Sequence, residues 1–191
     1  MPIEKDASTG ASPDAPARTA PAIRAATRAD LPAILAITNQ VIATSTAIYS
    51  LEPTTLAERG TWFDARIAAG FPVLVAAEHD TVLGFASFGE FRGAWPGYRH
   101  SVEHSVHVHA DCRGRGIGPR LVAALFPLAQ ALGKHVMIGG IDAANGASLR
   151  MHAQLGFEQV AHFREVGHKF GRWLDLVFMQ RFVDPPGAHR P

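Results

Sequence analysis

The sequence predicts an α/β fold, a strongly twisted mixed sheet of about seven strands with helices on both faces. Strand-like and helix-like segments follow one another in the order strand-helix-helix-strand-strand-strand-helix-strand-helix-strand-strand. Apolar residues make up 47% of the 191 residues, enough to bury the core of a single domain. A short turn at His79 and Asp80 joins two apolar segments, which indicates an antiparallel hairpin within the sheet.

We expect a single domain over residues 22–183, with a flexible tail at each end. Residues 1–21 carry almost no large apolar side chain, so burial cannot offset the entropy lost on ordering them. Residues 184–191 include the sequence Pro185-Pro186-Gly187 and are expected to be a second flexible tail.

Composition argues against several partners. Eighteen basic and 17 acidic residues give a formal charge of +1, so no overall field attracts nucleic acid or a membrane surface. No apolar segment reaches membrane-spanning length. The single cysteine, Cys112, cannot form an intramolecular disulfide, which favours the reducing cytoplasm as the location.

The first half of the domain has clear helix start signals. Asp30 is expected to cap a helix in whose first turn Pro32 is tolerated, and Thr55 is expected to cap the next helix, which ends at Gly70. The predicted elements are a strand over 23–26, a helix over 31–41, a helix over 56–69, and strands over 73–78 and 82–88.

The second half continues the alternation of strands and helices. Gly133 and Gly156 are each expected to end a helix. The predicted elements are a strand over 101–109, a helix from Pro119 onward, a strand over 135–141, a helix over 145–155, and strands over 157–166 and 173–182 joined by a hairpin at 167–172.

A glycine-rich, arginine-flanked turn joins the strand over 101–109 to the following helix. At such a junction successive backbone N–H groups are unpaired and the helix dipole favours an anion, which indicates a phosphate site. Glycine lets the backbone approach the phosphate, and arginine adds permanently charged donors. The candidate residues are Arg113, Gly114, Arg115, Gly116, Ile117 and Gly118.

Three sets of residues resemble one family. Arg113-x-x-Gly116-x-Gly118 resembles the coenzyme A pyrophosphate loop of the Gcn5-related (GNAT) N-acetyltransferases, and 145–157 resembles their second acyl-CoA motif, N-x-x-S-x-x-x-[Tyr/His]-x-x-x-G-F. A third set is similar to the phosphinothricin and methionine sulfoximine/sulfone acetyltransferase branch, and the whole resemblance covers 23–183. That third set comprises 46–49, 91–92, 102–106 and 169–175.

The resemblance implies acetyl-CoA as co-substrate and assigns its contacts. The backbone of Val106, His107 and Val108 is expected to hydrogen-bond the pantetheine arm, much as an added strand pairs with a sheet edge. Asn145 and Ser148 are implied to contact the pantetheine and phosphate portions.

Period-two alternation places Glu103, Ser105, His107 and His109 on one face of their strand, with His104 on the other. Acetyl transfer to an amine requires a deprotonated amine, so a carboxylate near the pocket is the expected general base. Glu103 occupies the position of the family's proposed base. The alternative is a paired structural carboxylate.

Helical spacing puts Asn145, Ser148 and His152 on one stripe. By resemblance His152 stands where many relatives have tyrosine, close to the sulfur. Its expected role is to protonate the departing thiolate or to orient the tetrahedral intermediate. The alternative is a histidine that packs the helix against the sheet.

The resemblance also assigns the acceptor, a small amino-acid-like molecule of the phosphinothricin, methionine sulfoximine or methionine sulfone type. Arg92 is expected to bind its carboxylate, and Trp95 and Tyr49 to line the pocket beside Glu103. The alternatives are a solvated arginine and a tyrosine that only packs.

Other functions remain alternatives. A different amine acceptor, such as a protein N-terminus or a polyamine, would use the same chemistry, and a non-catalytic acyl-CoA sensor would need neither Glu103 nor His152. A metal site is a further alternative, with Glu103, His104, His107 and His109 as its candidate ligands. Side chains on a flat strand do not converge on one point, so no metal is expected. The hairpin at 169–173 is implied to support the pocket or a homodimer interface.

Overall fold

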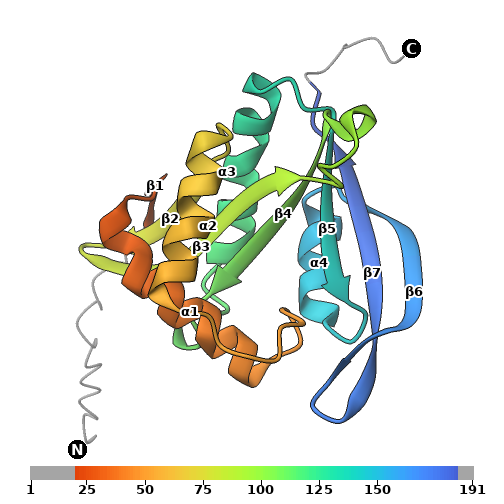
Figure 1. Ribbon diagram of the computed structural model, residues 1–191, viewed down its shortest axis with the longest axis horizontal. Helices are drawn as coiled ribbons and strands as arrows, with labels where there is room; N and C mark the ends of the chain where they lie inside the picture. Colours follow the sequence, from red (N-terminus) through yellow and green to blue (C-terminus); the bar gives the residue numbers. More distant parts are fainter. Residues whose placement is uncertain (1–19, 185–191) are drawn as a thin grey trace, which may run out of the picture.

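The computed structural model describes residues 20–184, and within this range the predicted α/β sheet is confirmed (Figure 1). The seven strands lie in the order β1-β2-β3-β4-β5-β7-β6. They are β1 Ala22–Ala25, β2 Val73–Glu78, β3 Thr81–Glu90, β4 Ser101–Val108, β5 Val136–Asp142, β6 Glu158–Lys169 and β7 Arg172–Phe182. The α-helices are α1 Leu31–Thr44, α2 Leu56–Ala68, α3 Ile117–Ala131 and α4 Gly146–Gln154. The predicted tails lie outside the described residues, except for 20, 21 and 184.

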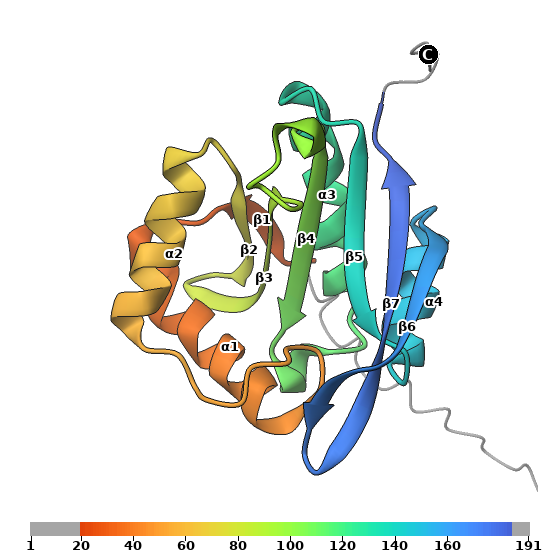
Figure 2. The ribbon, with the colours of Figure 1, turned by 45° about the vertical axis from the view of Figure 1, so that its right-hand side comes forward.

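Two apolar clusters, one on each face of the sheet, hold the helices in place. Val73, Val75 and Phe85 pack with residues of α1 and α2, whereas the alternate positions Leu74 and Ala76 pack with α3. Because successive side chains of a strand point to opposite faces, one apolar run can serve both clusters. α4 covers the same face as α3, next to β5 and β7 (Figure 2).

One pair of neighbouring strands differs from all the others. β4 and β5 are parallel, and their pairing ends at His104 and Gly139 although both strands continue. Every other pair of neighbours in the sheet is antiparallel. Beyond His104 the two strands diverge (Figure 2), which leaves the backbone of β4 after residue 104 unpaired on that side.

The predicted start of α2 is confirmed, whereas that of α1 needs a correction. Thr55 accepts a hydrogen bond from the Glu58 amide and Glu58 reciprocates, forming a capping box. Asp30 stands at the N-cap position of α1 but makes no cap bond. Its carboxylate instead binds Arg24, at 2.8 Å for each oxygen, and the Thr27 amide, and these bonds lower the pKa of Asp30 to about 2.

The hairpin between the last two strands is tighter than predicted. β6 continues to Lys169 and β7 begins at Arg172, so only Phe170 and Gly171 form the turn. Both have positive φ, 52° and 73°, the conformation of a type I′ turn whose twist matches the strands. The hairpin predicted over 167–172 is therefore four residues too long. In the structure Gly167 is paired with Leu174 within the ladder.

Candidate active site

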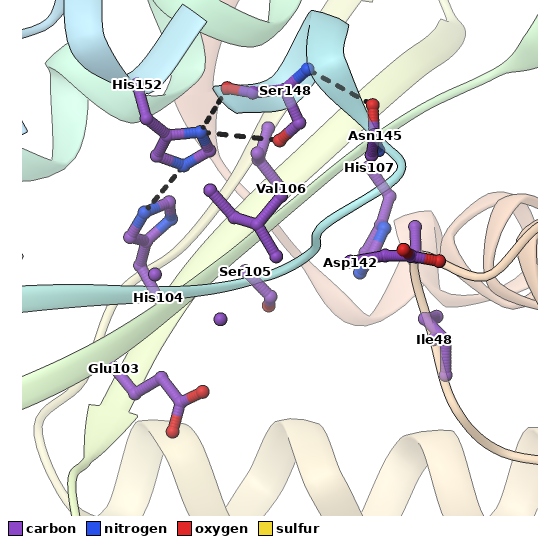
Figure 3. Close-up of a pocket in the computed structure, with 14 residues that line it drawn as sticks. Ile48, Glu103, His104, Ser105, Val106, His107, Asp142, Asn145, Ser148 and His152 are labelled. Atoms are coloured by element: carbon purple, nitrogen blue, oxygen red, sulfur yellow. Dashed lines mark hydrogen bonds between the residues drawn. The ribbon is translucent and has the colours of Figure 1, made fainter. Parts of the chain in front are cut away.

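A cavity of about 240 Å³ opens where β4 and β5 diverge. β4 contributes residues 103–107 and β5 contributes 139–142, while the loop after α1 adds Ala47 and Ile48. Asn145, Ser148 and His152 of α4 complete the wall (Figure 3). The structure therefore brings together Glu103, Val106, His107 and the predicted stripe of α4.

Glu103 lies on the side of β4 that faces away from α4 (Figure 3). A Cβ added at Gly140 would lie 3.2 Å from its Oε1, so the glycine makes room for the carboxylate. The carboxylate opens into the cavity, yet the surrounding protein displaces enough water to raise its pKa. A raised pKa suits a group that must take a proton near neutral pH.

Arg66 of α2 supplies a positive charge near Glu103. Its guanidinium rests on Gly89 so closely that an added Cβ there would overlap it, and Gly89 is the strand partner of Glu103. Arg66 opposes the rise in the Glu103 pKa through its charge, although burial lowers its own pKa. Its Nε is buried without a hydrogen-bond partner among the described residues. The sequence analysis did not single out Arg66, because only the fold places α2 over this strand.

Two buried imidazoles lie on the other side of β4. The Nε2 atoms of His104 and His152 are 3.2 Å apart, and the rings are stacked with centroids 5.1 Å apart (Figure 3). Gly139 makes room for them, because a Cβ there would lie 3.0 Å from His104 Nε2 and 3.3 Å from His152 Nε2. Burial lowers the pKa of both histidines, that of His104 to about 3. Both rings are therefore neutral at physiological pH.

The predicted stripe on α4 is confirmed, and its three residues are joined to one another by hydrogen bonds. Asn145 is the N-cap of α4 and accepts a 3.1 Å hydrogen bond from the Ser148 amide. Nδ1 of His152 lies 2.8 Å from the Ser148 carbonyl oxygen and 3.3 Å from Ser148 Oγ. The side chain of Asn145 thus also has a structural role, since it starts the helix that carries the other two.

The predicted phosphate loop borders a second cavity, of about 370 Å³. Gly114 and Gly116 have φ of 76° and 71°, a conformation that other residues rarely adopt, and Gly116 is the N-cap of α3. No side chain caps this helix, and its first turn holds no acidic residue. Its first amides are therefore available to an anion, which is the feature that a coenzyme A pyrophosphate requires.

The two cavities follow one another along the end of β4. Val106 and His107 line the first, and Val108 lines the second, where the loop faces Arg150 and Met151 of α4. An elongated acyl-CoA fits this course, with its thioester at the divergence of the strands and its pyrophosphate at the loop. Arg150 was missed in the sequence, although its place one turn from the N-terminus of α4 could have indicated it.

The two arginines of the loop have different surroundings. Arg115 forms an ion pair with Glu78 at the end of β2. This pair holds the loop against the sheet, and the contact of Arg115 with the phosphate stays a prediction. Arg113 reaches the Val108 carbonyl oxygen at 3.4 Å and lines the second cavity.

The predicted acceptor residues Tyr49, Arg92 and Trp95 do not line either cavity. The Tyr49 hydroxyl donates a 3.1 Å hydrogen bond to the Asp175 carbonyl, and its ring packs on Gly167, where an added Cβ would lie 2.5 Å away. Arg92 and Trp95 belong to the exposed connection between β3 and β4, and Trp95 is 66% exposed. Their role in acceptor binding stays a prediction.

Lys169 fixes the loop that closes the first cavity. This lysine is buried, and its Nζ donates to the carbonyl oxygens of Ser45 and Ile48 at 2.9 and 2.7 Å. Together with Tyr49 it fastens the loop after α1 to the β6–β7 hairpin. The resemblance implied support of the pocket by this hairpin, and Lys169 provides a physical basis for it.

Asp142 is a further carboxylate that the sequence analysis did not identify. It is 4% exposed and lines the first cavity. Its Oδ1 accepts a 2.8 Å hydrogen bond from the Ala144 amide, and its Oδ2 has no partner among the described residues. Asp142 is thus a second acidic group, besides Glu103, that lines this cavity.

Neither a cluster of metal ligands nor a membrane-spanning helix is present within residues 20–184. No cluster of three or more His, Cys, Asp or Glu side chains is arranged to hold a metal ion. No helix in this range is long and apolar enough to span a membrane.

Comparisons with known proteins agree on the family. Residues 23–178 match the model of the acetyltransferase (GNAT) domain. The chain is 50% identical over 164 residues to the L-methionine sulfoximine/L-methionine sulfone acetyltransferase of Pseudomonas paraeruginosa, covering 85% of this chain and 95% of that protein.

Two solved structures contain the co-substrate. A Salmonella typhimurium protein described as an acetyltransferase, solved with acetyl-CoA, is 44% identical with a TM-score of 0.85, covering 89% of this chain and 98% of that chain. A Sinorhizobium meliloti phosphinothricin acetyltransferase in complex with acetyl-CoA is 35% identical with a TM-score of 0.85, covering 91% of this chain and 94% of that chain.

Proposed function

Since the chain belongs to the GNAT acetyltransferase family and is an acetyl-CoA-dependent, acetyl-transferring enzyme, we propose that its acceptors are L-methionine sulfoximine, L-methionine sulfone and phosphinothricin. The proposed product is the N-acetylated α-amino group, formed by direct attack with Glu103 as general base. The similarity to the methionine sulfoximine/sulfone enzyme supports these acceptors. Phosphinothricin is supported by the more distant Sinorhizobium meliloti enzyme.

The residues of the two cavities suit acetyl-CoA. The amides at the start of α3 and the Arg113 guanidinium would hold the pyrophosphate, and the unpaired backbone of Val106 to Val108 would hold the pantetheine arm. Bound acetyl-CoA supplies the acetyl group as a thioester. His152 and Ser148 would lie beside the sulfur, where β4 and β5 diverge.

The single observation that carries the mechanism is the position of Glu103. Its carboxylate opens into the cavity on one side of β4, and the group that would face the thioester, His152, lies on the other. An amine that enters between the strands therefore meets the base before it reaches the carbonyl carbon. Glu103 takes the proton of the ammonium, directly or through water, and the free lone pair attacks.

Recognition of the acceptor involves groups near Glu103. Arg66, with its unpaired Nε, is a cation already placed on that side of the sheet. Arg92, Trp95 and Tyr49 are proposed to complete the pocket, which for Arg92 and Trp95 requires the connection between β3 and β4 to fold over the cavity. An arginine is the preferred partner of an amino-acid carboxylate because it binds both oxygens.

The assembly that we propose is a homodimer in the cytoplasm, with no nucleic-acid or membrane partner. The outer strand β6 and its hairpin expose large apolar side chains, whose burial would favour association. They include Val160, Phe163, Val166, Phe170 and Trp173. The cytoplasm is proposed because a lone Cys112 suits a reducing compartment.

Release of CoA thiol tests the proposed acceptors. The purified protein would be assayed with acetyl-CoA and a panel of phosphinothricin, methionine sulfoximine, methionine sulfone, ordinary amino acids, polyamines and short peptides. Saturable turnover confined to the first three supports the proposal. Turnover of polyamines or peptides alone would show that the acceptor belongs to a different class of amine. Binding of acetyl-CoA without any turnover would favour an acyl-CoA sensor.

A further inference from the structure

The hydrogen bonds around His152 determine where its proton lies. The Ser148 carbonyl oxygen can only accept, so the nitrogen 2.8 Å from it, Nδ1 of His152, carries a proton. The ring is neutral because burial lowers its pKa. Nε2 of His152 is therefore unprotonated.

The same reasoning determines which nitrogen of His104 carries its proton. Its Nε2 lies 3.2 Å from the unprotonated Nε2 of His152, so it must be the donor. A neutral imidazole carries a proton on only one ring nitrogen, so Nδ1 of His104 is unprotonated. That nitrogen is buried and has no hydrogen-bond partner among the described residues. The chain of bonds thus runs from His104 to His152 to the Ser148 carbonyl.

We propose that His104 is a positioning residue that holds His152 as a neutral imidazole protonated at Nδ1, so that His152 orients the thioester and does not donate a proton. The proposal rests on the proposed acetyl transfer. The only proton of His152 is bound to a backbone carbonyl, and its Nε2 lone pair is occupied. Neither nitrogen can serve the departing sulfur as an acid.

Neighbouring side chains hold the two imidazole rings in place and keep them neutral. Phe157 contacts both imidazoles, with centroids 5.4 Å from His104 and 5.1 Å from His152. His107 is the other titratable group that acts on His104, and its charge would lower the pKa of His104 further. Burial keeps His107 neutral too, lowering its pKa to about 4. Among the described residues, none of the charges that shift the pKa of His104 or His152 raises it.

The reaction balances without a proton from His152. Glu103 takes one proton from the ammonium and returns it to solvent. The nitrogen–carbon bond then forms as the carbon–sulfur bond breaks, the nitrogen loses its second proton to solvent, and the thiolate takes one proton from solvent. His152 contributes a fixed polar wall at the thioester. This role requires the correct tautomer, which the Ser148 carbonyl sets at Nδ1, and the correct ring orientation, which the hydrogen bond from His104 to Nε2 holds.

Nitrogen NMR of ¹⁵N-histidine-labelled protein tests the tautomers directly, with His152→Gln used to assign the signals. We expect one protonated and one unprotonated nitrogen for His152, unchanged as the pH rises above neutral because burial lowers its pKa. His104→Gln keeps an N–H donor near the Nε2 position, so it should preserve this pattern. His104→Leu removes the donor and should shift the signal of the unprotonated Nε2, while Nδ1 stays protonated through its bond to the Ser148 carbonyl.

Turnover measured on the same variants separates positioning from folding. His104→Leu should lower kcat about tenfold, which corresponds to one lost hydrogen bond, while His104→Gln should restore most of it. A His152 ring protonated at both nitrogens near neutral pH, or a wild-type NMR pattern in His104→Leu, would overturn the proposal. The NMR measurement needs no acceptor, so it remains decisive if the acceptor panel fails.

Discussion

The carboxylate of Glu103 lies against Gly140 of the neighbouring strand, where an added Cβ would be 3.2 Å from Oε1 and 3.1 Å from Cε1 of Phe178. Both distances are shorter than ordinary van der Waals contact, so a methyl group would displace one of these side chains. Gly140→Ala is therefore expected to move the base and to lower kcat/KM about tenfold, since small displacements of catalytic groups are costly. Steady-state kinetics measures the effect.

Gly60→Ala is the matched control for that substitution. Gly60 lies within α2 with nothing within 4 Å of an added Cβ. Alanine there should leave the kinetics unchanged and stabilise the fold by about 0.5–1 kcal/mol. If both alanine variants keep wild-type kcat/KM, the close contact between residue 140 and Glu103 has no bearing on the reaction.

The pH dependence of the reaction should respond to Arg66. Burial raises the pKa of Glu103 and the charge of Arg66 opposes that rise, so Arg66→Met should raise the pKa further. The base works only when deprotonated, so the acidic limb of the kcat/KM profile should move to higher pH. Arg28→Met, which removes a cation from an exposed ion pair with Asp64, should leave the limb in place. If the acidic limb stays fixed or moves to lower pH in Arg66→Met, the charge of Arg66 does not act on the group that forms the limb, contrary to its assignment to Glu103.

The start of α3 can be tested with two glycines that share one backbone conformation. Gly116 and Gly133 have φ of 71° and 64°, and neither has an atom within 4 Å of an added Cβ. Alanine at either position should cost about 1–2 kcal/mol of stability, because a Cβ disfavours the left-handed conformation. Only Gly116→Ala should also raise KM for acetyl-CoA, about tenfold, by shifting the amides that face the phosphate. Equal KM values for the two variants would contradict a phosphate site at this loop.

Lys169 is expected to contribute to both stability and acceptor binding. Lys169→Met leaves the carbonyl oxygens of Ser45 and Ile48 without their donor, which should lower the free energy of unfolding by about 1–3 kcal/mol. Because Ile48 lines the cavity, KM for the acceptor should rise as well. Lys134→Met, which removes a half-buried lysine whose hydrogen bond to the Arg99 carbonyl is exposed, should cost less than about 1 kcal/mol. Urea unfolding of the two variants makes the comparison, and equal losses would argue against a special role for Lys169.

The glycine-rich loop and the stripe on α4 could be placed from the sequence because their signals are local. The glycines of the loop and the stripe of Asn145, Ser148 and His152 each lie within one turn or one helix, so spacing alone places them. The succession of strands and helices along the chain follows from similar short-range patterns. The exception was the hairpin predicted over 167–172, of which Gly167 is paired within a strand.

The long-range contacts of the site were less predictable because they join distant segments. His104 and His152 are 48 residues apart, and Arg66 meets Gly89 only because α2 packs across the sheet. Nothing in the local sequence indicates that Arg115 pairs with Glu78 or that Lys169 is buried against the Ser45 carbonyl. These long-range pairs depend on the tertiary packing.

The pH profile of kcat/KM with L-methionine sulfone, compared between the wild type, Glu103→Gln and Asp142→Asn, tests the central claim most directly. If Glu103 is the general base, Glu103→Gln should lower kcat/KM by about 10²- to 10³-fold and abolish the acidic limb, because glutamine cannot take a proton. Asp142→Asn should retain that limb. A Glu103→Gln enzyme that keeps both its rate and its acidic limb, with the limb lost in Asp142→Asn, would contradict the account and assign the base to Asp142.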